Sequence, residues 1–198
     1  PFRFFLTAPL FGVLISIVFF FSPFDEISNQ YSHLAIGVIH LFTLGILSMI
    51  IFGAMQQMMP VLAGAILKKP RLFANIVHPS LVLGTLSMSF SFIFEIKMLL
   101  HIGVLFLTIS FLTFFSLSIK LLFKVEFLTS TVKAMKLFSL AGFITLILGL
   151  YLAIAHISSN IGEQHYVFVN MHILFALFGF ALLIIMGVSF QVIPMFYV

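Results

Sequence analysis

The sequence predicts an all-α polytopic membrane protein with six transmembrane helices. Of its 198 residues, 63% are hydrophobic and only 7% are charged, whereas a soluble domain carries roughly a quarter charged residues. The apolar residues form continuous runs of about 20 or more, which is long enough to cross a hydrocarbon core about 30 Å thick. Continuous runs also exclude a transmembrane β-barrel, because its strands alternate apolar and polar residues.

The six runs predict the helices in chain order. They are Phe4–Phe24, Ser32–Met59, Leu72–Phe94, Met98–Phe123, Val132–Ile157 and Tyr166–Pro194. A cleaved signal peptide does not explain the first run, since five more spans follow it. Several prolines fall near predicted helix ends, where a missing N–H is easiest to accommodate. Pro60 and Pro194 are interpreted as the stops of the second and sixth helices.

The basic residues predict how the helices are oriented. All nine Lys and Arg residues except Lys97 lie on one side of the predicted bundle: Arg3, Lys68, Lys69, Arg71, Lys120, Lys124, Lys133 and Lys136. Lys97 lies on the opposite, outer side beside Glu95, and the other connections on that side are acidic or neutral. The positive-inside rule therefore places the N-terminus in the cytoplasm and predicts a multi-pass protein of the inner (cytoplasmic) membrane. The pI near 9.6 reflects these basic residues on one side of the membrane and does not indicate nucleic-acid binding.

An internal repeat is the most informative pattern. His33, His40, Gly53, Gln57 and Pro60 recur as His165, His172, Gly187, Gln191 and Pro194. Each copy has the form H-x6-H, an apolar run and G-x3-Q-x2-P, with two extra residues between the second histidine and the glycine of the later copy. The segment beginning at Arg3 also resembles the segment beginning at Lys136, at an offset of 133.

The repeat predicts the domain organisation. Residues 1–198 form a single membrane domain, in which 1–129 is a first four-helix repeat and 130–198 is the first half of a second. Because each unit has an even number of helices, the repeats are parallel. We expect the chain to be a fragment of a larger bundle of eight to twelve helices.

The histidines are the candidate cofactor ligands. Six of them lie toward the predicted outer side: His33, His40, His101, His156, His165 and His172. Residues seven apart on a helix share a face and differ by about 10 Å in depth, so each H-x6-H presents an outer and an inner imidazole. His40 and His172 are the best candidates for metal or haem ligation, His33 and His165 come next, and His101 and His156 follow. For His33 and His165 the alternative is an interfacial histidine that hydrogen-bonds headgroups or water. His40 and His172 lie deeper, where an unliganded imidazole needs a polar partner. His78 is interpreted as a satisfied interfacial histidine.

Absent residue types narrow the chemistry. The chain has no cysteine, which excludes disulfides, thiolate ligands and iron–sulfur clusters within it. No Asp or Glu is expected deep within a predicted span, so proton pumping has no acidic relay here. No residue is singled out as catalytic.

On these residues the chain resembles the catalytic subunit of haem–copper oxidases and, in overall texture, the NnrS family of haem- and copper-containing membrane proteins. The similar features are histidines on helices two and six, the Phe-rich segment from Phe2 to Leu6, and the segment from Gly53 to Gly64. The resemblance implies haem b, with or without copper, and a diatomic gas ligand (NO or O2). It also implies a redox partner or respiratory-complex subunits alongside the lipid bilayer.

The sequence therefore predicts a haem-binding membrane protein in nitric oxide handling or membrane redox chemistry and electron transfer. Whether it is an enzyme stays open, and the resemblance implies an oxidoreductase of the haem–copper oxidase or nitric oxide reductase type. Two alternatives stay open as well. One is a transition-metal transporter or channel, and the other is a structural subunit of a respiratory complex.

Overall fold

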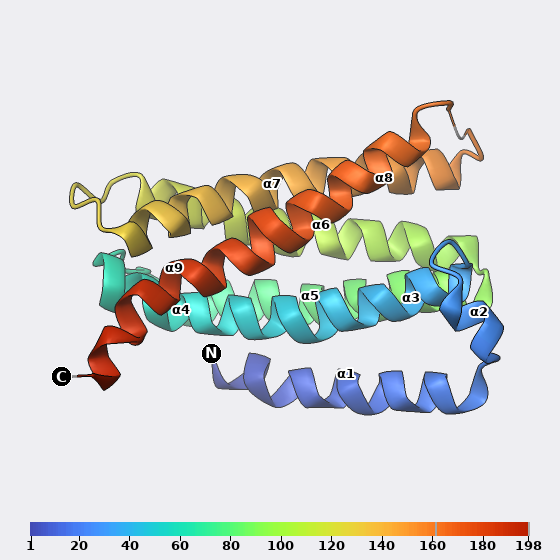
Figure 1. Ribbon diagram of the computed structural model, residues 1–198, viewed down its shortest axis with the longest axis horizontal. Coiled ribbons are helices and arrows are strands. Elements are labelled where there is room, and N and C mark those ends of the chain that lie inside the picture. The colour runs from blue at the N-terminus through green and yellow to red at the C-terminus, as the bar shows by residue number, and fades with distance from the viewer. Residues whose placement is uncertain (161, 198) are drawn as a thin grey trace. The chain divides into compact units, whose positions relative to one another are not determined.

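The chain is an all-α polytopic membrane protein, as predicted. The computed structural model describes residues 1–160 and 162–197, and within them six helices are long and apolar enough to cross a membrane. Figure 1 shows their order along the chain. The spans are α1 (Phe2–Phe21), α3 to α4 (His33–Ala63), α5 (Pro70–Phe94), α6 (Lys97–Leu122), α7 (Ser130–Ile157) and α8 to α9, which with η3 cover His165–Phe196.

Two of the spans contain a π-helical segment. The second span consists of α3 (His33–Phe42), η1 (Thr43–Ser48) and α4 (Met49–Ala63). The sixth consists of α8 (His165–Leu174), η2 (Phe175–Leu182) and α9 (Leu183–Val192), followed by the short 3-10 helix η3 (Pro194–Phe196). In both spans the π segment begins three residues after the second histidine of the repeat.

The prolines act differently from the prediction at two helix ends. The first span ends at Phe21, not Phe24, because Ser22 is extended (φ −104°, ψ 146°) before Pro23; the ring of a proline disfavours helical backbone in the residue before it. A short helix, α2 (Phe24–Ser28), follows. The interpretation of Pro60 as a helix stop is wrong, since α4 continues through Pro60 to Ala63. At the second copy α9 does end before Pro194.

The described chain divides by its contacts into two compact units. Unit 1 is Pro1–Ala54 with Arg71–Ser110, and unit 2 is Met55–Pro70 with Phe111–Val198. In unit 1 the first helix packs on the histidine-bearing span through two glycines. A Cβ on Gly53 would lie 2.9 Å from Phe4 Cβ, and one on Gly45 would overlap the Phe11 ring. Both phenylalanines are buried, so the glycines permit this close approach.

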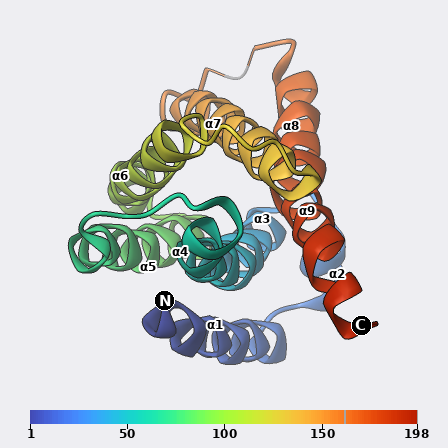
Figure 2. The same ribbon diagram turned by 90° about the vertical axis from the view of Figure 1, so that its left-hand side faces the viewer.

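Unit 2 repeats this packing. Figure 2 shows α7 beside the span that contains α8 and α9. A Cβ on Gly179 would lie 2.7 Å from Ala141 Cβ, and one on Gly187 would overlap Ala134 Cβ. The glycine pair is again eight residues apart and its partner pair seven apart, as in unit 1. In this packing Phe4 corresponds to Ala134, an offset of 130 residues. The predicted offset was 133, so the two alignments differ by three residues, or nearly one helical turn.

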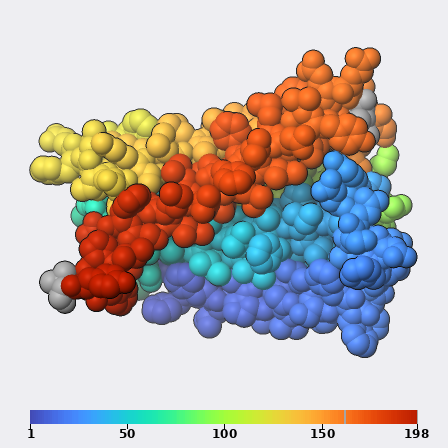
Figure 3. Space-filling view, in the orientation of Figure 1, coloured from blue at the N-terminus to red at the C-terminus, as the bar shows by residue number. Residues whose placement is uncertain are grey.

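The core of unit 2 is aromatic. Phe115 contacts four other rings at centroid distances of 5.4 to 5.9 Å, and Phe138 stacks on Phe180 at 5.1 Å. The sixth span is largely exposed. Only 22% of an 18-residue apolar window within it is buried, and Figure 3 shows this span along the visible face of its unit. Large apolar side chains on such a face are suited to contact with lipid.

Candidate histidine sites

His40 lies on α3, and its tautomer follows from its hydrogen bond. Its Nδ1 is 2.8 Å from the carbonyl oxygen of Ile36, one turn earlier on the same helix. A carbonyl oxygen only accepts, so Nδ1 carries the proton and the lone pair of the neutral ring is on Nε2. The ring stacks on Phe92 of α5, with centroids 6.0 Å apart and planes 15° apart. Both contacts fix the direction of Nε2.

His172, the equivalent residue on α8, has the same tautomer but a different hydrogen-bond acceptor. Its Nδ1 donates to the carbonyl oxygen of Thr145 on α7, at 3.1 Å. Gly149, one turn further along α7, makes room for the ring, since a Cβ there would lie 3.0 Å from His172 Cε1. The neighbouring helix therefore orients this imidazole, whereas His40 is oriented by its own helix. In both residues the ring nitrogen with the lone pair is Nε2.

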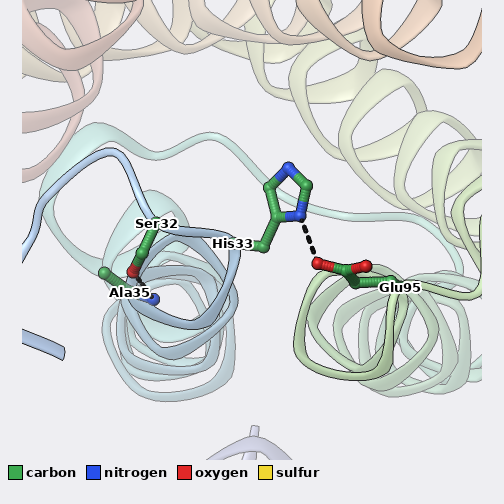
Figure 4. A network of polar contacts seen from close by, with 4 residues as sticks. All are labelled: Ser32, His33, Ala35 and Glu95. Carbon is green, nitrogen blue, oxygen red and sulfur yellow. Dashed lines mark hydrogen bonds and ion pairs between the residues drawn. The ribbon is translucent and has the colours of Figure 1, made fainter. Parts of the chain in front are cut away.

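His33 forms a side-chain hydrogen bond with Glu95 that was not predicted from the sequence. Its Nδ1 lies 3.0 Å from Glu95 Oε1, and Figure 4 shows the two side chains pointing toward each other with the second ring nitrogen directed away from the carboxylate. Ser32 caps α3 by accepting a hydrogen bond from the Ala35 N–H at 3.0 Å, which fixes the start of the helix beside His33. The sequence indicated this contact only in that both His33 and Glu95 were predicted on the outer side.

The backbone at Glu95 is strained. Its φ is 55°, in the left-handed region that favours glycine. The N–H of Ile96 donates to the Ser91 carbonyl at 3.1 Å, which is the 6→1 hydrogen bond of a Schellman helix end. A glutamate is unfavourable there, both for its Cβ and for its charge at a helix C-terminus. Strained residues of this kind cluster at functional sites.

The remaining candidates differ in their surroundings. His165 Nδ1 is buried with no hydrogen-bond partner among the residues that the structure describes, and its ring meets Tyr166 edge-on at 5.9 Å. His101 is exposed and donates from Nδ1 to its own helix at Lys97, at 3.0 Å. His156 is half-buried in the last turn of α7. His78 hydrogen-bonds Thr7 Oγ1 through Nε2 at 2.9 Å, so it is a satisfied histidine.

Within unit 1 the structure brings His33 and His40 to one aromatic ring. Phe92 lies 6.3 Å from the His33 ring and 6.0 Å from the His40 ring. Across residues 1–160 and 162–197, no three or more His, Asp or Glu side chains converge into a group that could hold a metal ion. The repeated glutamines of the G-x3-Q-x2-P motif, Gln57 and Gln191, are both exposed, so neither lines an interior path.

The oriented imidazoles fit the chemistry of a haem or metal ligand. Metal-ligating histidines almost always donate their other ring N–H to a carbonyl or carboxylate, which fixes the tautomer and raises ligand basicity. His40 and His172 have the carbonyl version and His33 has the carboxylate version. No family model, curated protein or solved structure matches this chain.

Proposed function

We propose that this chain binds haem b in the membrane, with or without copper, and takes part in nitric oxide handling or membrane redox chemistry. His40 and His172 are the first candidates for the ligands, and His33 and His165 are the next. One observation carries the proposal: the two best candidates each donate Nδ1–H to a backbone carbonyl, so each has its lone pair on an oriented Nε2. The choice of nitric oxide among membrane redox substrates rests on the sequence resemblance.

The surroundings of these residues support a haem more than a hydrated ion. Phe92 covers one face of the His40 ring, and a ring in apolar surroundings is shielded from water. Bound haem would supply an iron that exchanges one electron and binds a diatomic gas. The residues of the chain would hold the ligand nitrogens in place, exclude water and thereby tune the iron potential.

The test is a reduced-minus-oxidised absorption spectrum of the purified full-length protein from haem-replete cells, with and without CO, together with total iron and copper. We expect a haem b spectrum that is lost or strongly altered in His40→Ala and in His172→Ala. The matched control is His78→Ala, which also removes a hydrogen-bonded imidazole from a helix but should leave the spectrum unchanged.

The alternative outcomes separate the competing functions. Protein without haem but with stoichiometric copper or another transition metal would refute the proposal and support a transporter or channel. Protein with neither, whose parent complex keeps its cofactors and turnover in the histidine variants, would be a structural subunit. Each variant is first checked for folding by gel filtration and circular dichroism, so that loss of haem is not confused with loss of structure.

A further inference from the structure

A groove lies at the end of unit 2 that carries its lysines. It has a volume of about 370 Å³ and is bounded by the end of α4 with the following turn, Ala63 to Ile66, and by the end of α6 with the following turn, Leu121 to Phe127. A second hollow of about 250 Å³ shares Ala63, Gly64, Val125 and Phe127 with it and reaches the start of α7 at Thr129 and Val132. The two hollows are therefore adjacent.

The groove lies in a strongly positive region. Unit 2 carries six lysines near this end, with Glu126 as the one acidic residue beside them in the described sequence there: Lys68, Lys69, Lys120, Lys124, Lys133 and Lys136. Lys124 and Glu126 line the groove directly. The net positive charge would attract an anion, and a low-dielectric wall would strengthen the attraction.

Lys136 is held against the groove wall. Its Nζ donates to the carbonyl oxygen of Val125 at 3.3 Å and lies 5.3 Å from the centroid of the Phe123 ring. Val125 lines both parts of the groove. The bond to Val125 uses one of the three N–H donors of the ammonium. Because Lys136 is half-buried, its ammonium is positioned before a ligand arrives.

Large apolar side chains are exposed beside these charges. Ile66 is 69% exposed, Phe123 54% and Phe127 83%. Exposed apolar side chains next to lysines, at the end of membrane-spanning helices, are suited to the boundary between headgroups and acyl chains. A ligand of this groove is therefore expected to carry both a negative charge and a hydrocarbon chain.

We propose that this groove binds one anionic phospholipid with a hydroxyl-bearing headgroup, such as phosphatidylglycerol. Lys124 and Lys136 bind the phosphate, the carboxylate of Glu126 accepts the headgroup hydroxyls, and the exposed apolar residues contact the start of the acyl chains. Basic pockets between membrane helices are a known kind of lipid headgroup site. The proposal does not depend on haem binding.

The test measures binding of short-chain phospholipids to the delipidated full-length protein in detergent, by native mass spectrometry and by the rise in melting temperature. Phosphatidylglycerol should bind more tightly than phosphatidylethanolamine or phosphatidylcholine, and inorganic phosphate at the same concentration should give no stabilisation. Removing two lysine charges that contact the lipid should weaken phosphatidylglycerol binding about 25-fold in Lys124→Gln/Lys136→Gln.

The matched control is Lys68→Gln/Lys69→Gln, which removes the same charge from the same unit. Within the described part of the chain these two lysines do not line the groove and, unlike Lys136, form no hydrogen bond to a residue that lines it. Its binding should fall by less than about threefold, because charges away from the lipid are screened. Lys124 is exposed, so Lys124→Gln alone should weaken binding about fivefold without affecting folding. Equal losses in the two double variants, or equally tight binding of phosphatidylcholine, phosphatidylethanolamine or free phosphate, would overturn the proposal.

Discussion

Replacing Glu95 by glycine should stabilise the protein although it removes the hydrogen bond between His33 and Glu95. The backbone at this position has φ 55°, where a side chain costs about 1 kcal/mol relative to glycine. The carboxylate also lies at the C-terminus of α5, where a negative charge costs roughly 0.3 to 1 kcal/mol. The lost contact with His33 opposes this gain. The Glu95 side chain is 73% exposed and the His33 side chain 46% exposed, and exposed pairs contribute about 0 to 1 kcal/mol to stability.

The sum favours Glu95→Gly by about 1 kcal/mol of unfolding free energy. The assay is equilibrium unfolding in mixed micelles with increasing SDS, followed by helical circular dichroism. Glu95→Ala removes the same charge and the same pair but keeps a Cβ, so it should be less stable than Glu95→Gly by about 1 kcal/mol.

A loss of 1 kcal/mol or more in Glu95→Gly would refute this reasoning, because the contact between His33 and Glu95 would then outweigh the backbone strain. The same variant also tests whether Glu95 serves the stability of the fold or the orientation of the His33 ring. Without Glu95 the His33 ring loses the acceptor of its Nδ1–H, so 15N chemical shifts of that ring should show a mixture of tautomers. A more stable protein with a less ordered His33 would mean that the glutamate is retained for the histidine and not for folding.

Two further predictions concern packing in unit 2 and unit 1. Gly142→Ala should destabilise the protein by about 1 to 3 kcal/mol, because the new methyl group would overlap the buried Phe115 ring within a cluster that cannot move freely. Gly12→Ala is the control, since its Cβ would meet nothing nearer than 3.9 Å, and it should be more stable by about 0.5 to 1 kcal/mol. The same SDS titration compares the two variants. Thr131→Val should cost about 0.6 to 1 kcal/mol, because it removes the buried hydrogen bond from the Thr131 hydroxyl to the Gly187 carbonyl at 2.9 Å. Thr131→Ser keeps the hydroxyl and should lose less. A larger loss in Thr131→Ser than in Thr131→Val would show that packing of the methyl group matters more than the hydrogen bond.

The membrane spans could be predicted because hydrophobic length alone decides them. The predicted third span, Leu72–Phe94, and the observed α5, Pro70–Phe94, differ by two residues at the start, where proline is favoured in the first helical turn. The start of the fifth span moved in the same way, to Ser130, because Thr129 caps α7 by accepting from the Val132 N–H. Caps depend on local hydrogen bonds that a hydropathy pattern does not contain.

The site could be predicted only in part, for a different reason. The repeat singled out His40 and His172 as equivalent, and both donate Nδ1–H to a carbonyl. Sequence spacing could not show that one carbonyl belongs to the same helix and the other to α7, since that depends on how the helices pack. Glu95 was seen only as an outer charge, because neither its left-handed backbone nor its distance to His33 follows from residue type.

The π segments explain how the two copies of the repeat can differ in length. The two extra residues after His172 correspond to the lengths of the segments, since η2 has eight residues and η1 has six. In a regular α-helix one inserted residue rotates everything beyond it by about 100°, which would turn a packed glycine face toward lipid. Here the glycines beyond each π segment still contact the preceding helix. The π segments therefore let the two histidine-bearing spans differ by two residues between the second histidine and the packed glycines, while the packing beyond them is kept.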